Sequence, residues 1–335
     1  MDKYNDSCYI NSMYTLLQFL LLRNRDERKK TFYFLGRGIS KDIAKHFENS
    51  WHLNTKFKNE KGLKRYIKIY LLYRDLEKFI IEENLINKIM YMQDNMSYSQ
   101  FFLNHMKNCY LLEDGFSNYK VTAFKKKTKK GIKKIRDKFL KRYKHEYQTF
   151  GLSERIKKIY LTGIMEIPEV IKNKVEIINL REKWDKLQNN EKEEILNIFD
   201  LKLEEFYNLE KYSDKVLIIT QPLSEDGIIS EEEKISIYKE IIDKYPVKDI
   251  IIKSHPREKT DYKKIYSDIE TINRRFPLEL LMLLGIYFKT VVTVFSTAAL
   301  NFKGISNVHF IGTEKYPNLL KKCAMAKEEY FERKK

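Results

Sequence analysis

The sequence feature that most restricts the fold is a regular alternation of short apolar segments with longer segments of helical periodicity. The expected strands are Ser7–Asn11, Thr31–Leu35, Lys88–Gln93, Asn108–Leu112, Lys158–Ile164, Val175–Asn179, Lys215–Thr220, Asp249–Lys253, Thr290–Phe295 and Val308–Ile311. The expected helices are a stretch ending at Leu22, then Leu63–Glu83, Tyr98–Met106, Glu191–Asn208, Glu231–Lys244, Leu278–Phe288 and Tyr316–Arg333. Short apolar strands separated by helices are typical of parallel sheets with right-handed crossovers. The sequence therefore predicts an α/β protein.

A strongly basic segment divides this pattern into two halves. Residues 125–144 contain 12 Lys or Arg residues and one acidic residue, and they lack a strand pattern. A chain of 335 residues is long enough for two domains. We therefore expect two Rossmann-like domains with parallel sheets, residues 1–120 and 155–335, joined by a basic helical connector at 121–154.

The cysteines and the apolar runs restrict the compartment. Cys8, Cys109 and Cys323 are too far apart for a disulfide framework or a zinc knuckle, which is typical of a protein in a reducing compartment. The apolar run Met13–Leu22 is too short to cross a membrane, and no basic region precedes it. A cytoplasmic location is expected, which leaves attachment to a membrane surface open.

Polar and ionisable residues follow four of the expected strands. They read EDG at 113–115, QPLSEDG at 221–227, SHPR at 254–257 and STAA at 296–299. In open α/β sheets, ligands bind at the carboxyl ends of the strands. The pattern therefore favours acid–base chemistry on a phosphorylated ligand.

His255 is the only one of the six histidines that follows an apolar strand and precedes proline. Pro256 favours extended backbone at His255, which directs the imidazole away from the sheet end. A histidine there can donate a proton to a phosphate oxygen. The alternative is a strand-end histidine that only holds its loop, but Lys253 and Arg257 beside it favour an anionic ligand.

The other candidate residues each have a structural alternative. Ser296 and Thr297 precede a short expected helix, so they are first a helix N-cap, and the same place suits a phosphate. The pairs Glu113–Asp114 and Glu225–Asp226 are followed by glycine, which is also an ordinary turn pattern. Glu279 stands at an expected helix start, where acidic residues are favoured, and it is also placed to reach ribose hydroxyls.

Several enzyme classes are excluded by missing motifs. The chain has no Asp-x-Asp, so the metal site of many nucleotide-sugar enzymes is missing, and no metal or cofactor is expected. It also lacks GxGxxG and GxxxxGK[ST], which argues against a dinucleotide dehydrogenase and a P-loop NTPase. The GxSxG and HExxH motifs are missing too.

The ordered motifs EDG, QPLSEDG, KSHPRE, FPLELL and FSTAAL resemble those of bacterial sialyltransferases. The nearest resemblance is to glycosyltransferase family 52, which includes lipooligosaccharide α-2,3-sialyltransferases, and CYINSMYTLLQFLLL is similar to that family's start. The resemblance implies a GT-B-like fold, in which two Rossmann-like domains face each other across a cleft. It implies an inverting, metal-independent transfer of sialic acid from CMP-sialic acid to a terminal galactose of a lipooligosaccharide or related glycan.

The resemblance also implies roles for individual residues. His255 would protonate or hydrogen-bond the leaving CMP phosphate, and the donor side would include Gln221, Pro256, Glu279, Ser296 and Thr297. Asp226 is expected to be the general base, with Asp114 and Glu113 as the alternative base or acceptor side. Residues 1–120 would be the acceptor-side domain and residues 155–335 the nucleotide-sugar-binding domain. A homodimer is expected from the family.

The basic segment has its own alternatives. Ile132, Ile135, Phe139, Tyr143 and Tyr147 form one apolar helical face among lysines and arginines. This face either packs on the protein or on a second subunit, or it brings residues 125–147 to an anionic membrane surface, with the enzyme peripheral on the inner face of the cell membrane. Nucleic acid is the less favoured partner, since no nucleic-acid-binding motif is present. A glucosyltransferase of the same fold, or a non-enzymatic polyanion-binding protein, are the alternative functions.

Overall fold

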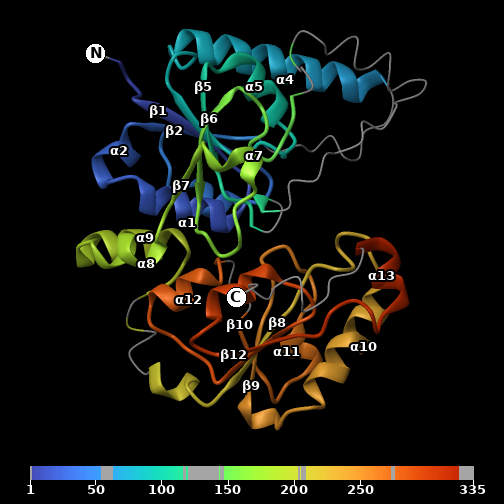
Figure 1. The fold of residues 1–335 in the computed structure, drawn as a ribbon. Helices are drawn as coiled ribbons and strands as arrows, with labels where there is room; N and C mark the ends of the chain where they lie inside the picture. The colour runs from blue at the N-terminus through green and yellow to red at the C-terminus, as the bar shows by residue number, and fades with distance from the viewer. Residues whose placement is uncertain are drawn as a thin grey trace. The chain divides into compact units, whose positions relative to one another are not determined.

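The chain divides into two compact units, Met1–Lys186 (unit 1) and Leu187–Lys335 (unit 2). The computed structural model describes residues 2–53, 63–115, 118–119, 143, 147–202, 204, 209–272 and 276–323. Each unit contains one wholly parallel sheet with helices packed on it (Figure 1). The expected α/β class with two parallel sheets is confirmed.

The sheet of unit 1 has seven strands in the order β3-β2-β1-β4-β5-β6-β7. Their bounds are β1 Asp6–Ile10, β2 Thr31–Leu35, β3 Ser50–His52, β4 Ile89–Met92, β5 Asn108–Leu112, β6 Ile156–Leu161 and β7 Val175–Ile177. The central strands are buried on both faces, which explains why they are apolar throughout. The strand order reverses between β1 and β4.

Helices cover both faces of this sheet. Their bounds are α1 Met13–Leu22, α2 Arg25–Lys29, α3 Lys41–Ala44, α4 Leu63–Glu82, α5 Ser99–His105, α7 Glu169–Lys172 and α8 Leu180–Asp185. Phe19 of α1 packs its ring against Tyr33 and Tyr91. Phe79 of α4 packs against Phe32 on the other face. Alternate residues of β2 therefore face α1 and α4, as the two-residue period of a strand requires.

The sheet of unit 2 has five strands in the order β10-β9-β8-β11-β12. Their bounds are β8 Val216–Ile219, β9 Ile250–Lys253, β10 Glu270–Ile272, β11 Thr290–Thr293 and β12 Asn307–Phe310. The α-helices are α9 Asn189–Ile198, α10 Glu231–Ile242, α11 Tyr262–Ile265, α12 Glu279–Leu283 and α13 Pro317–Cys323. The described residues of the unit also form the 3₁₀ helices η4 Leu209–Tyr212, η5 Val247–Asp249 and η6 Thr297–Phe302. The strand order reverses between β8 and β11.

The expected domain boundary needs correction. Residues 155–186 were assigned to the second domain, but β6 pairs in parallel with β5, and β7 with β6, so these strands extend the first sheet. Unit 2 begins at Leu187. The basic segment does not mark the domain boundary, because the chain returns to the same sheet after it. Most of the expected connector lies outside the described residues, but Tyr143 is buried in the core of unit 1 and contacts Tyr70 and Tyr73.

Several expected helices are shorter in the structure. The helix expected at 191–208 ends at Ile198, because Asp200 takes a positive φ and Phe199 is the C-cap. The helix expected at 278–288 ends at Leu283, before Gly285, whose φ is +80°. Only the first part of the last helix, Pro317–Cys323, lies in the described residues. The short strands β3 and β10 were not expected, because three residues carry too little periodicity.

Candidate functional site

The carboxyl ends of β8 and β11 lie at the point where the strand order of unit 2 reverses, and ligands bind at such points in open α/β sheets. Gln221 follows β8, and its Oε1 accepts from the Phe295 backbone N–H at 3.0 Å. The Gln221 N–H donates to the Tyr238 hydroxyl at 2.7 Å. Gln221 thus joins the two loops that carry the QPLSEDG and FSTAAL motifs.

His255 lies in a tight turn directly after β9. The Glu258 N–H donates to the His255 carbonyl at 2.9 Å, with Pro256 at the second position of the turn, where proline is favoured. The Arg257 N–H donates to His255 Nδ1 at 3.1 Å. Since Nδ1 is an acceptor, a neutral His255 carries its proton on Nε2 and has that N–H to offer a ligand.

The electrostatic surroundings of His255 favour the neutral form. Burial is the main cause that lowers its pKa to about 4, and the cations Arg257 and Lys253 add to the effect. Asp226 and Glu225 oppose it weakly. Without a bound anion, His255 is therefore a hydrogen-bond donor near neutral pH.

Asp226 forms an ion pair with Arg257. Arg257 donates from Nη1 to Asp226 Oδ1 at 2.5 Å and from Nη2 to Oδ2 at 3.0 Å. Both side chains are partly exposed, at 47% for Arg257 and 37% for Asp226. The structure thus brings Asp226 to the His255 turn, but both carboxylate oxygens are occupied by the guanidinium. A base role for Asp226 requires this ion pair to open.

Ser296, Thr297 and Glu279 lie around the short helix η6. Ser296 occupies the N-cap position as expected, but its side chain makes no capping hydrogen bond, which corrects that part of the expectation. The Ser296 backbone N–H donates to Thr293 Oγ1 at 3.2 Å. The Thr293 hydroxyl in turn donates to the Ile219 carbonyl. Glu279 is buried at the start of α12 and accepts from Asn301 Nδ2 at 3.1 Å. The FPLELL and FSTAAL motifs therefore meet.

The two acidic residues of EDG follow β5 in unit 1, and their surroundings differ. Glu113 is fully buried and accepts from Tyr14, Tyr119 and the Thr162 backbone, so it joins α1 and the end of β6. Burial raises its pKa. These contacts favour a structural role for Glu113.

Asp114 is held differently. Its Oδ1 accepts from Gln93 Nε2, and its Oδ2 accepts from Asn95 Nδ2 at 2.9 Å. Gln93 also accepts from the Asn11 backbone N–H at 3.1 Å, across the point where the strand order of this sheet reverses. Asp114 is thus the carboxylate of EDG that is linked through Gln93 to the point where the strand order of the first sheet reverses, and in open α/β sheets ligands bind at such points.

Sequence reasoning missed the residues that support these loops. Lys234 and Gln93 belong to none of the motifs identified in the sequence, and Glu258 ends the KSHPRE motif without having been assigned a role. Lys234 is an exception to the amphipathic pattern of α10, since it shares a buried face with Ile237 and Tyr238. That placement is the one signal that pointed to it.

The described residues contain neither a group of side chains arranged to hold a metal ion nor a helix able to cross a membrane. No group of three or more His, Cys, Asp or Glu side chains there is arranged to hold a metal ion. No helix in the same ranges is both long and apolar enough to cross a membrane.

Sequence comparisons agree with the motif order. The profile of Glycosyltransferase family 52 matches residues 27–313. An uncharacterized protein of Haemophilus influenzae (strain Rd) is 34% identical over 319 residues, which cover 93% of this chain and 96% of that protein.

Structural comparisons match both units to GT-B enzymes. The α/β-galactoside α-2,3-sialyltransferase of Photobacterium phosphoreum has a TM-score of 0.57 at 12% identity, covering 92% of this chain and 90% of that one. The GT-B domain of the Photobacterium damselae sialyltransferase gives 0.53 at 14%, covering 91% and 89%. The 2,6-sialyltransferase of Photobacterium sp. JT-ISH-224, in complex with CMP and lactose, gives 0.54 at 14%, covering 88% and 69%. With the profile match over most of the chain, these findings show that the protein has a GT-B fold and belongs to Glycosyltransferase family 52.

Proposed function

We propose that this chain is an inverting, metal-independent sialyltransferase that moves sialic acid from CMP-sialic acid to a galactose hydroxyl of a lipooligosaccharide or related glycan. The observation that carries the proposal is the geometry of His255. Its Nδ1 accepts from the Arg257 N–H, so its Nε2–H is the donor at the ligand-binding edge of the sheet. Membership of family 52 and the similarity to sialyltransferase structures support the donor class.

The reaction requires a leaving group on one side of the sugar and a base on the other. The acceptor oxygen forms a bond to the anomeric carbon of sialic acid as the bond from that carbon to the CMP phosphate oxygen breaks. The bonding electrons go to the phosphate, and the hydroxyl proton goes to the base. His255 meets the new charge with its Nε2–H, and phosphate binding favours the protonated form of the imidazole.

The remaining donor-side roles are those that the family resemblance implies. The hydroxyls of Ser296 and Thr297 are proposed to bind the phosphate, and Glu279 to contact the ribose. Pro256 shapes the His255 turn. Gln221 spends its side-chain oxygen on Phe295, so we propose that it acts on the donor by holding the Ser296 loop in place.

Asp226 remains the proposed base. A phosphate group near Arg257 competes with Asp226 for the guanidinium, so donor binding would release the carboxylate, which must then reach the face of the sugar opposite the phosphate. Asp114, oriented by Gln93 and Asn95, is the alternative base or an acceptor-side residue. A homodimer and a membrane-surface role for 125–147 remain predictions.

A panel of donors tests the proposed function. Purified protein is incubated with lactose and either CMP-sialic acid, UDP-glucose or UDP-galactose, and the product is identified by mass spectrometry. We expect sialyllactose from CMP-sialic acid alone. A hexosyl product from a UDP-sugar would replace the proposal with a glucosyltransferase-type activity of the same fold. No product, together with no thermal stabilisation by CMP, would contradict it.

A further inference from the structure

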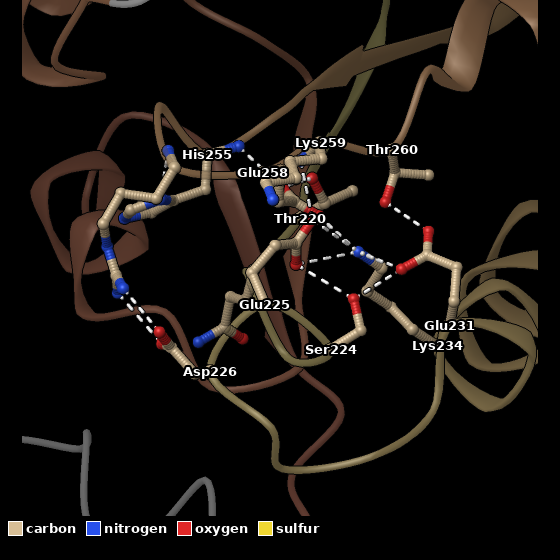
Figure 2. Close-up of polar contacts among 12 residues, drawn as sticks. Thr220, Ser224, Glu225, Asp226, Glu231, Lys234, His255, Glu258, Lys259 and Thr260 are labelled. Atoms are coloured by element: carbon tan, nitrogen blue, oxygen red, sulfur yellow. Dashed lines mark hydrogen bonds and ion pairs between the residues drawn. The ribbon is translucent and has the colours of Figure 1, made fainter. Parts of the chain in front are cut away.

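A buried lysine lies between three carboxylates beside the site (Figure 2). The Lys234 side chain is 0% exposed. Its Nζ lies 3.0 Å from Glu225 Oε2, 3.0 Å from Glu231 Oε2 and 3.7 Å from Glu258 Oε1. Burying a charged amine is costly unless partners surround it, so this arrangement is held by its own ion pairs.

The three carboxylates come from three different segments. Glu225 belongs to the loop after β8, Glu231 begins α10, and Glu258 belongs to the loop after β9. The first two also reach across to the β9 loop. Glu225 Oε1 accepts from the Lys259 N–H at 2.6 Å, and Glu231 Oε1 accepts from the Thr260 hydroxyl at 2.5 Å. One lysine therefore ties the loop that carries Asp226 to the loop that carries His255.

Glu258 binds both backbone polar groups of His255. The Glu258 carboxylate accepts from the His255 N–H at 2.7 Å, and the Glu258 N–H donates to the His255 carbonyl at 2.9 Å. The same carboxylate accepts from the hydroxyls of Thr220 and Tyr262. The side chain of Glu258 is 0% exposed, so its position is fixed by these contacts.

We propose that Glu258 is a positioning residue for His255, and that Lys234 is the cation that keeps Glu258 and Glu225 in place and sets the Asp226 loop against the His255 loop. The inference rests on the proposed function, because it assigns His255 the contact with the leaving phosphate. It adds four residues, Lys234, Glu225, Glu231 and Glu258, that touch no substrate and act through the two loops.

A purely structural network would behave differently from this one. An apolar cluster of the same size is often as stable as a buried ion pair, so stability alone gives little reason for these charges. Two of their contacts are to the backbone of the β9 loop, from the His255 N–H to Glu258 and from the Lys259 N–H to Glu225. Catalysis depends on position to within about 1 Å, and a misplacement of that size costs about 10²-fold in rate.

Four variants separate these cases. Glu258→Gln keeps the shape of the side chain and removes its charge and one of its two acceptors. Lys234→Met removes the shared cation and keeps the length of the side chain. Thr220→Val removes one hydroxyl from Glu258 and leaves the His255 contact intact. Glu240→Gln is the matched control, since Glu240 lies on the same helix and pairs with Lys315 at the surface.

The kinetic readout is turnover of CMP-sialic acid on lactose below the melting temperature of each variant. We expect Glu258→Gln and Lys234→Met to lower kcat by about 10²-fold, while KM for the donor changes by less than about threefold. Thr220→Val should lower kcat in the same direction by less. Glu240→Gln should match the wild type.

The second readout needs no substrate. NMR titration follows the His255 imidazole, identified among the six histidines by its loss in His255→Asn. In the wild type it should titrate near pH 4, because burial and the nearby Arg257 and Lys253 disfavour its charge. A loosened turn admits water and frees Nδ1, so in Glu258→Gln the titration should move upward toward 6.5. A purely electrostatic loss of a carboxylate would move it downward.

The two readouts distinguish failure of the proposed function from failure of the positioning role. If the wild type transfers no sialic acid but the His255 titration shifts as expected in Glu258→Gln, the proposed function fails and the positioning role stands. If Glu258→Gln does not fold, Thr220→Val carries the test. Folded variants with wild-type kcat and an unchanged His255 titration would overturn the inference.

Discussion

Single residues in this protein carry charges whose environment decides their state. Burial lowers the pKa of His255 and raises the pKa of Asp94, so both groups favour the neutral form. Burial and neighbouring cations hold the His255 imidazole neutral, so that it is a hydrogen-bond donor before an anion binds. Asp94 follows β4, is 1% exposed, and accepts from the Phe150 and Gly151 N–H groups at 2.8 Å each. It thereby fixes residues 150–151, which both have positive φ, to the end of the first sheet.

Asp94 should make unit 1 more stable in mild acid. Burial, the largest cause, raises its pKa from 3.8 to about 6, and the two backbone hydrogen bonds oppose this only in part. A group whose pKa is raised on folding contributes stability that is complete below pH 3.8 and is lost as the pH rises through 6. A shift of two units corresponds to about 3 kcal/mol.

Urea unfolding of the wild type and Asp94→Asn between pH 4 and pH 7 tests this. The stability of the wild type relative to the variant should be about 2 kcal/mol greater at pH 4 than at pH 7, because the unfolded carboxyl is only partly protonated at pH 4. The contribution of His255 has the opposite sign, but it is common to both proteins and cancels in the difference. A difference that stays constant with pH would contradict the assignment.

At the scale of elements, each sheet has a glutamine at the point where its strand order reverses. In unit 1, Gln93 after β4 accepts from the Asn11 N–H after β1. In unit 2, Gln221 after β8 accepts from the Phe295 N–H after β11. Diverging strand ends leave backbone donors unpaired at such points. The side-chain oxygen of each glutamine accepts from one such backbone donor, and it thereby links the two loops between which the ligand is expected.

Gln221 should therefore affect the Ser296 loop without touching the chemistry. In Gln221→Leu the Phe295 N–H loses its acceptor, so the loop loosens and the affinity for CMP should fall by about tenfold, the effect of about 1.4 kcal/mol. Gln221→Glu keeps an acceptor and should retain most of the affinity. Calorimetric titration measures the affinity of each variant for CMP. Equal affinities of Gln221→Leu and the wild type would rule out the loop-holding role.

The loop after β2 approaches β1 closely enough to require glycine. A Cβ on Gly38 would lie 1.8 Å from the Asn11 carbonyl oxygen. Gly304 has a φ of +84° but open space around it, so it is a matched control for backbone strain alone. Gly38→Ala should lower the free energy of unfolding by about 3 kcal/mol through overpacking, and Gly304→Ala by about 1 kcal/mol. Equal losses in chemical denaturation would contradict this.

The sequence predicted the buried strands well and their surroundings poorly. Thr31–Leu35 and Asn108–Leu112 match β2 and β5 residue for residue, because the buried residues of a parallel strand form a short apolar run: β2 is buried throughout, and Cys109, Leu111 and Leu112 of β5 are buried. It failed at β6 and β7, since no local pattern tells which sheet a strand joins. His255 and Asp226 were found because they follow strands, whereas Glu258 and Lys234 act through contacts between distant segments that one sequence does not display.

At the scale of the whole molecule, the protein consists of two units, each with its own sheet and its own core. Gln221, His255, Glu279 and Ser296, the proposed donor-side residues, all belong to unit 2. Asp114 and its amide partners belong to unit 1. The proposed donor-side residues therefore belong to one unit, and Asp226, the proposed base on the acceptor hydroxyl, lies in that same unit.

Hydrogen exchange in the presence of CMP tests that placement. Ligand at 100 times its dissociation constant stabilises the form that binds it by about 2.7 kcal/mol. Amides of β8, β9 and β11 should gain protection in the full-length protein, while those of β1, β2 and β4 should change much less. An equal gain in both sheets, or a gain confined to unit 1, would contradict the placement of the donor site in unit 2.

The most direct test of the central claim is turnover of CMP-sialic acid with lactose, in EDTA, by the wild type and by His255→Ala. We predict sialyllactose formation that persists in the chelator and falls by at least about 10²-fold in the variant, because the leaving phosphate loses its donor. CMP should still bind the variant. Wild-type turnover by His255→Ala, or none by the wild type, would contradict the account.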